Sequence, residues 1–217
     1  MKVIAFSLFF ALFALSSAYD SENDFSTVTC GSSIKLKNRA SGFRLHSHDV
    51  KWGSGSGQQS VTSTGSKDDP NSLWVVHAKH GDPMCPRGTP VKCGDTIRLM
   101  HSATRANLHS HLFRSPLSQQ QEVSAFGVEG EGDTGDNWIV DCLNAQPGSN
   151  WDRKSAIRFR HADTRKYLHT HASHKFDRGN CGFTCPIIGQ QEVTAFGQKN
   201  DDNVWAVAEG IIFPSLK

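Results

Sequence analysis

The chain has no second long apolar run, no marked excess of one charge and no Asn-x-Ser/Thr sequon. Its one apolar run, Val3 to Leu15, is shorter than the about 20 residues that a spanning helix needs, so membrane insertion is not expected. With Lys2 set aside from the 23 Lys and Arg, 22 cationic residues face 21 acidic ones. This balance lacks the basic surface that binds nucleic acid. The missing sequon argues against N-glycosylation.

The first residues have the pattern of a secretory signal. Met1-Lys2 precedes the apolar run, and Ser16-Ser17-Ala18 supplies the small residues that signal peptidase prefers. We therefore expect a signal peptide over residues 1–18, an extension over 19–29 and one domain over 30–217. The secretory pathway is the expected compartment.

Six cysteines lie in the part that would be exported, where an oxidising environment favours disulfides. Six cysteines allow fifteen pairings, so the sequence leaves the connectivity open. Cys85 and Cys93 are close enough to form a local clip, whereas symmetry should separate Cys30 from Cys93. Cys181 and Cys185 are expected to form a disulfide rather than a zinc site, because zinc sites usually show Cys-x2-Cys pairs.

The most informative feature that is present is a threefold repeat. The tetrapeptide Leu-His-(Ser/Thr)-His begins at Leu45, Leu108 and Leu168. In each unit an Ile-Lys/Arg-Leu/Phe segment precedes it, and a Gln-Gln-x-Val segment and a tryptophan segment follow it. The period indicates three units, at about 30–92, 93–152 and 153–213, that fold together because one unit cannot close its own core.

Short alternating apolar runs, separated by glycine-rich turns, predict four strands in each unit. Closing twelve strands into a barrel removes exposed sheet edges. We predict an all-β fold, a β-trefoil with pseudo-threefold symmetry; a three-bladed propeller is the alternative. The predicted core consists of Ile34, Leu36, Trp74, Ile97, Leu99, Trp138, Ile157, Phe159 and Trp205.

The repeated motifs, with His46-Ser47-His48 leading to Gly53–Gly57 and Gln58-Gln59, resemble the stromal cell-derived factor 2-like family over nearly the whole exported chain. The resemblance implies three MIR repeats, a β-trefoil, no enzymatic activity, and residence in the endoplasmic reticulum lumen. It also implies partnership with a luminal Hsp70, its J-domain co-chaperone or unfolded clients. The chain ends in Pro214-Ser215-Leu216-Lys217 instead of the retention tetrapeptide of many relatives, so export from the cell is an alternative.

The repeated histidines could be ligands or structural groups. Strand alternation places both histidines of a tetrapeptide on one side, opposite the leucine. Because three equal copies favour a scaffold over one unique site, we expect these imidazoles to bond to backbone groups in the strand connections, and we predict no catalytic residue, metal or cofactor. Ser47 lacks the Gly-x-Ser-x-Gly context of a nucleophile, and the recurrence of Glu122 and Glu192 also suggests structure. The histidines are His46, His48, His109, His111, His169 and His171.

Two binding functions remain. An adaptor would use the segments in which the units differ, namely 53–57, 66–70, 129–136 and 174–189, because variable loops on a rigid scaffold commonly bind partners. A lectin for mannose-type glycans would use exposed aromatic rings beside polar groups. Trp52 and Trp151 lie outside the repeated core positions and could do this, or could cover an edge of the barrel. The candidate binding residues are Trp52, Gly53, Gly55, Gly57, Trp151, Asp152 and His174.

Overall fold

The computed structural model describes residues 25–216. The predicted signal peptide and residues 19–24 of the predicted extension lie outside the described residues. Packing begins before residue 30, because Val28 is fully buried in the core and Thr27 pairs with Asp152. Within residues 25–216, no helix has the length and apolar character to cross a membrane.

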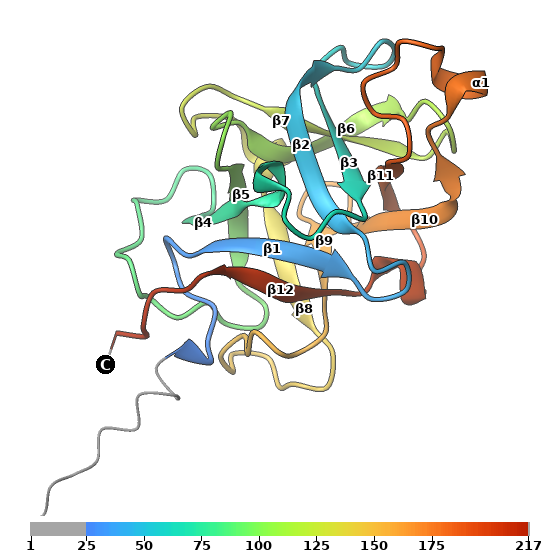
Figure 1. The fold of residues 1–217 in the computed structure, drawn as a ribbon. Helices are drawn as coiled ribbons and strands as arrows, with labels where there is room; N and C mark the ends of the chain where they lie inside the picture. Colours follow the sequence, from blue (N-terminus) through green and yellow to red (C-terminus); the bar gives the residue numbers. More distant parts are fainter. Residues whose placement is uncertain (1–24, 217) are drawn as a thin grey trace, which may run out of the picture.

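Six of the twelve strands formed by residues 25–216 close into a barrel through antiparallel pairs. β1 pairs with β4 and β12, β5 with β4 and β8, and β9 with β8 and β12, so the ring has no free end. Figure 1 shows β1 lying beside β12, which brings the first and last described strands together. The barrel strands are β1 (Ser33–Asn38), β4 (Trp74–Ala78), β5 (Thr96–His101), β8 (Trp138–Cys142), β9 (Ile157–His161) and β12 (Trp205–Ile211).

The other six strands form one hairpin per unit at one end of the barrel. Their inner strands β3, β7 and β11 also pair with each other, so the hairpins make a triangular cap. This arrangement is a β-trefoil, which confirms the fold prediction and makes the propeller alternative wrong. The hairpins are β2 (Arg44–Lys51) with β3 (Gln59–Thr64), β6 (Asn107–Arg114) with β7 (Gln121–Phe126), and β10 (Tyr167–Lys175) with β11 (Gln191–Phe196).

Helix is minor, as the sequence predicts. A 3₁₀ turn precedes the last strand of each unit, and one helical turn lies in the loop after β10. These elements are η2 (Pro70–Ser72), η3 (Thr134–Asp136), η4 (Asp201–Asn203) and α1 (Arg178–Cys181).

The barrel interior contains all nine predicted core residues. None of them exposes more than 3% of its surface. Their positions on the barrel strands follow from alternation, because successive side chains of a strand point to opposite faces. The three units therefore share one core, as the repeat period indicates.

Three disulfides tie the loops. They join Cys30 to Cys85, Cys93 to Cys142, and Cys181 to Cys185. The predicted disulfide between Cys181 and Cys185 is confirmed. The predicted Cys85–Cys93 clip is wrong, because Cys85 lies against the segment that leads into β1 and Cys93 against the end of β8.

Hydrogen bonds between the units repeat cyclically in the cap. The first glutamine of each Gln-Gln pair accepts a hydrogen bond from the hydroxyl that ends the same block in the next unit. This cycle fixes the three hairpins relative to one another and explains why the block is repeated. The pairs are Gln58 with Ser124, Gln120 with Thr194, and Gln190 with Thr62.

Candidate functional site

The Leu-His-(Ser/Thr)-His motif lies on the outer strand of each hairpin, where it joins cap to barrel. Its leucine is fully buried, and the leucine carbonyl accepts a hydrogen bond from the core tryptophan of the same unit. The Leu-His-(Ser/Thr)-His motif is therefore hydrogen-bonded to the tryptophan segment of the same unit. The donor–acceptor pairs are Trp74 with Leu45 at 3.1 Å, Trp138 with Leu108 at 2.9 Å, and Trp205 with Leu168 at 2.9 Å.

The hydroxyl residue of the motif closes the hairpin. Ser47 Oγ donates to the carbonyl of Ser60 at 2.7 Å, and Gln59 Nε2 donates to Ser47 Oγ at 2.7 Å. Ser110 and Thr170 make the equivalent bonds to the carbonyls of Glu122 and Glu192. A buried hydroxyl engaged in this way serves the fold and leaves no nucleophile facing solvent.

The first histidine of each motif is 4% exposed, but its surroundings differ between the units. His46 Nδ1 donates to Asp69 at 2.7 Å, and His109 Nδ1 donates to Asp136 at 2.9 Å. The expectation of backbone partners is therefore wrong for these two rings, because the 3₁₀ turn presents a carboxylate. His169 Nδ1 has no hydrogen-bond partner among the described residues. Burial lowers the pKa of His169 to about 4.

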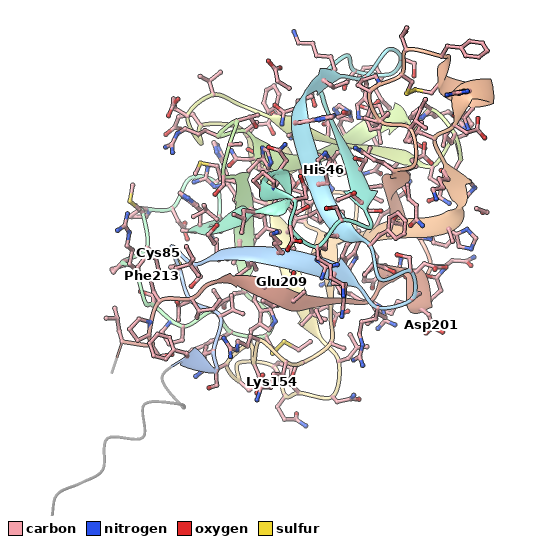
Figure 2. The ribbon with its side chains drawn as sticks, viewed as in Figure 1. His46, Cys85, Lys154, Asp201, Glu209 and Phe213 are labelled. Carbon is pink, nitrogen blue, oxygen red and sulfur yellow. A yellow bond between two sulfur atoms is a disulfide. The ribbon has the colours of Figure 1, made fainter. Side chains whose placement is uncertain are left out.

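The second histidine lies beside the first, which confirms the predicted common face. The ring centroids are 4.9 Å apart for His46 and His48, and 5.1 Å apart for His109 and His111. Burial, followed by the neighbouring His46, lowers the pKa of His48. His111 Nε2 donates to Glu122 at 2.9 Å, so this carboxylate has a positioning role. Figure 2 shows His46 on β2, in the cap.

Two further histidines escaped the sequence reasoning although their positions repeat. His101 Nε2 donates to the carbonyl of Asn71 in η2, and His161 Nε2 donates to that of Gly135 in η3, both at 2.9 Å. In the first unit Asn38 donates in the same way to Asp202 in η4. Each unit thus holds the 3₁₀ turn of the unit before it. The sequence does contain a signal for these residues, because each is the final residue of the repeated Ile-x-Leu/Phe-x-His/Asn segment.

Trp52 is not an exposed ring. It is 6% exposed, its Nε1 donates to the carbonyl of Val123, and it packs with Phe176 and Ile187 in a small second core. The sugar-binding platform does not fit a buried ring, and the ring packs among the cap hairpins rather than over a barrel edge. The loop after Trp52 instead binds a carboxylate of the next unit: Ser56 donates its backbone N–H and its hydroxyl to Glu122.

Trp151 is fully buried in the main core, so it too cannot stack on a sugar. Asp152 is exposed, and its carboxylate accepts a hydrogen bond from the backbone N–H of Lys154. Figure 1 shows the loop that carries Trp151 and Asp152 at the end of the barrel away from the cap. The loop after Trp52, with Gly53, Gly55 and Gly57, lies at the cap, as does His174, whose ring centroid is 5.5 Å from that of His171. The predicted binding residues therefore do not form one site.

Exposed apolar side chains occur on the hairpin of the second unit and on that of the third. Leu112 and Phe113 on β6 are 83% and 52% exposed, and Phe183 and Ile188 in the loop after α1 are 83% and 43% exposed. We call these four the hairpin apolar residues. The Cys181–Cys185 disulfide and the guanidinium of Arg178, 5.9 Å from the Phe183 ring centroid, restrain the loop.

A groove of about 790 Å³ lies between the second and third units, and of the four hairpin apolar residues Leu112 is in its lining. It is lined by His109, His111 and Asp133 from the second unit and by Asp163 and Lys166 from the third. Gln121 also lines it, and Gln121 Oε1 is buried without a hydrogen-bond partner in the described part of the chain. The groove therefore offers polar side chains from two units to a ligand, while Gln121 Oε1 lies buried behind its lining.

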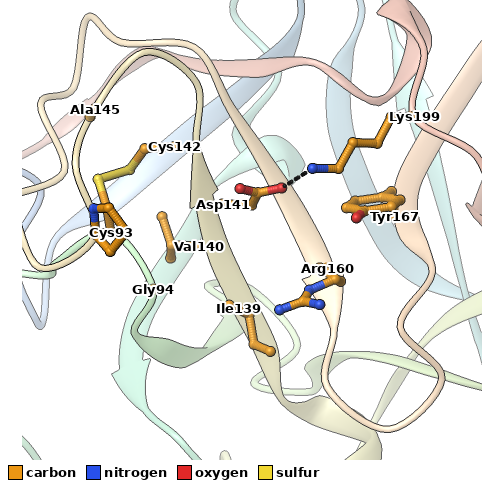
Figure 3. Close-up of a pocket in the computed structure, with 11 residues that line it drawn as sticks. Cys93, Gly94, Ile139, Val140, Asp141, Cys142, Ala145, Arg160, Tyr167 and Lys199 are labelled. Atoms are coloured by element: carbon orange, nitrogen blue, oxygen red, sulfur yellow. Dashed lines mark ion pairs between the residues drawn. A yellow bond between two sulfur atoms is a disulfide. The ribbon is translucent and has the colours of Figure 1, made fainter.

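A smaller hollow of about 250 Å³ lies beside the Cys93–Cys142 disulfide. Figure 3 shows Lys199 reaching toward Asp141, with Tyr167 next to it. The Lys199 and Asp141 charges are 3.0 Å apart, and the ammonium is 5.3 Å from the Tyr167 ring centroid. The hydrogen bond to Asp141 raises the pKa of Lys199. Since these groups satisfy each other, this hollow is a weaker candidate than the groove.

Comparison with known proteins agrees with the repeat analysis. The MIR domain model matches residues 50–206. A stromal cell-derived factor 2-like protein from Dictyostelium discoideum is 49% identical over 93% of this chain and 91% of its own. The crystal structure of the related protein from Arabidopsis thaliana superposes with a TM-score of 0.80 at 44% identity, over 88% of this chain and 99% of that one.

A larger protein contains the same architecture. The Saccharomyces cerevisiae protein O-mannosyltransferase Pmt1-Pmt2 complex, solved bound to the sugar donor, matches with a TM-score of 0.70 at 28% identity. The match covers 88% of this chain but 28% of the transferase chain. The likeness therefore concerns one part of that enzyme.

Proposed function

Because this chain belongs to the stromal cell-derived factor 2 family of MIR-domain proteins, we propose that it is a non-enzymatic adaptor of the luminal chaperone system. Its partner would be a luminal Hsp70, a J-domain co-chaperone or an unfolded client in the endoplasmic reticulum. The stromal cell-derived factor 2 relatives carry names that denote no reaction, which is compatible with a binding role.

The observation that carries this proposal is the set of hairpin apolar residues. Leu112 and Phe183 each expose 83% of their surface although the neighbouring core is well packed. Large exposed apolar groups commonly mark protein-binding surfaces. Here they stand on strands and a disulfide-tied loop, so little conformational entropy would be lost when a partner binds.

The test is a pull-down from a luminal extract with the purified chain, read by mass spectrometry. We expect Hsp70 and J-domain proteins to be enriched over a mock column, and the triple variant L112S/F113S/F183S to weaken capture about tenfold or more, as loss of apolar anchors does at interfaces. Met84→Ser is the matched control, because Met84 is 86% exposed but lies in the loop between β4 and β5. Failure to enrich any such chaperone would end the adaptor proposal.

Glycan binding is the second candidate, supported by the groove and by the likeness to part of a mannosyltransferase. Side chains that line the groove, such as Asp163 and Lys166, could bind sugar hydroxyls. Screening the chain on a glycan array tests this. Binding to mannose-type glycans that D163N/K166Q weakens is the expected result for a lectin, and silence across the array excludes it.

A further inference from the structure

We propose that His109, Asp133 and Asp136 form a binding site for one divalent metal ion, with Zn²⁺ the best match to the ligands. The three ligand atoms lie within 4.8 Å of one another. His109 Nδ1 is 2.9 Å from Asp136 Oδ1 and 3.6 Å from Asp133 Oδ1. This site goes beyond the adaptor role and does not depend on it.

The spacing suits tetrahedral coordination. Zinc lies about 2.0–2.1 Å from histidine nitrogen and carboxylate oxygen, which places neighbouring ligand atoms about 3.3 Å apart. The two separations from His109 Nδ1 lie on either side of this value, and the two carboxylate oxygens lie within 4.8 Å of each other. One nitrogen and two oxygens also favour Zn²⁺ over Ca²⁺, which takes oxygen ligands alone. A metal would replace the proton now shared between His109 and Asp136.

The ligands are held in position by the rest of the fold. Asp136 is fully buried, and its second oxygen accepts hydrogen bonds from Asn107 Nδ2 and from the backbone N–H of Asp133, which leaves Oδ1 facing the imidazole. Asp133 Oδ1 accepts from the backbone N–H of Gly135. His109 and Asp133 line the groove, so water could complete the coordination.

Gly135 gives independent support. A Cβ at this position would lie 2.4 Å from His109 Cε1, 2.9 Å from His109 Nδ1 and 3.0 Å from Asp133 Oδ1. The His109 imidazole could not keep its present position if this residue carried a Cβ. The equivalent residues in η2 and η4 are Asn71 and Asp202, so the opening is specific to the second unit.

The other two units show that the fold does not need carboxylates at both the Asp133 and the Asp136 positions. In the first unit, Asp69 and Ser72 occupy the places of Asp133 and Asp136. In the third unit, Asn200 and Asn203 occupy them and still form a capping box. Amides therefore cap this turn adequately, and the second unit alone sets two carboxylates against one histidine. A bound cation offsets their mutual repulsion.

The repeats supply the test variant. D133N/D136N gives the second unit the Asn–Asn pair of the third unit. The variant protein should therefore fold, and circular dichroism and the midpoint of urea unfolding would verify this. We expect calorimetric titration of the full chain with ZnCl₂ to show one site per chain. The double variant should weaken binding more than about a hundredfold, because even supporting residues of metal sites cost up to that factor.

Two controls make the result specific. Asp69→Asn removes the equivalent carboxylate of the first unit and should leave Zn²⁺ affinity unchanged. His171→Gln removes the partly exposed second histidine of the third unit and should also leave it unchanged. No binding by the wild-type chain overturns the proposal. So does binding that D133N/D136N leaves intact or that His171→Gln abolishes, because either result would place the ion outside the cluster of His109, Asp133 and Asp136. If D133N/D136N fails to fold, Asp133→Asn alone serves, since Asp133 is largely exposed.

Discussion

At the scale of single residues, the equivalent positions of the three units act as natural substitutions of one another. Asn38, His101 and His161 all end the first strand of a unit, and all hold the preceding 3₁₀ turn. The asparagine amide reproduces both imidazole bonds: its N–H donates to a carbonyl and its oxygen accepts from the backbone three residues on. Histidine at this place differs from asparagine chiefly in that it titrates.

This difference predicts how acid affects stability. Burial lowers the pKa of His101 to about 4, whereas a histidine in the unfolded chain has a pKa near 6.5. The unfolded state therefore takes up a proton that the native state does not bind. This contribution to stability is present above pH 6.5 and is lost as pH falls from 6.5 toward 4, by about 3 kcal/mol for such a group at pH 4.

His101→Asn should retain the fold and reduce this loss. We expect urea unfolding at pH 7.5 to give a similar free energy for the variant and the wild type. At pH 5 the variant should lose about 1–2 kcal/mol less than the wild type. Parallel pH profiles for the two proteins would show that His101 does not carry the effect. His169, with a pKa also about 4, should account for part of the remaining slope.

At the scale of elements, the loops at the ends of the hairpins differ between the units, but two of them bind a glutamate of the next unit. The sequence predicts the loop 53–57 to be a turn and a binding segment. Gly55 does adopt a positive φ of 67°, but the loop is shaped around Glu122 of the next unit. Glu192 accepts in the same way from the backbone N–H groups of Leu117 and Ser118. The recurring glutamates are therefore structural, as their repetition suggests.

The two glycines of this loop give a matched pair of substitutions. A Cβ at Gly55 would lie 1.9 Å from Glu122 Oε2, and its backbone angle is unfavourable for alanine. Gly53 has neither problem, since among the described residues nothing lies within 4 Å of the point that a Cβ would occupy. We expect Gly55→Ala to cost about 1–3 kcal/mol of unfolding free energy and Gly53→Ala less than about 0.5 kcal/mol. Equal costs in urea unfolding would contradict the role given to the Glu122 contact.

The sequence predicts elements better than contacts. Alternation identifies the barrel strands and their inward residues, because burial on one face leaves a period of two that can be read locally. The partners of His46 and His109 cannot be read, because Asp69 and Asp136 lie 23 and 27 residues away along the chain. Trp52 misleads for a similar reason: the residues that bury it, Phe176 and Ile187, belong to the third unit.

At the scale of the whole molecule, the repeat predicts the β-trefoil, since three units with one incomplete core each must close on one another. Symmetry also separates Cys30 from Cys93. It cannot pair the cysteines, because Cys85 and Cys142 hold places that have no cysteine in the other units. The Cys85–Cys93 clip fails on this point: both residues lie in the connection between β4 and β5, but they reach cysteines 55 and 49 residues away along the chain, respectively.

The disulfides differ in what they contribute to the closed barrel. Cys93 and Cys142 are 49 residues apart and span nearly the whole second unit, whereas Cys181 and Cys185 are 4 residues apart. Because a cross-link stabilises by restricting the unfolded chain, C93S/C142S should lose about 4 kcal/mol and C181S/C185S about 2 kcal/mol. Urea midpoints of the two double variants measure this. Should the short link prove the more stabilising, the third-unit loop would be part of the cooperative fold rather than an attachment to it, and the Trp52 cluster beneath it would be the reason.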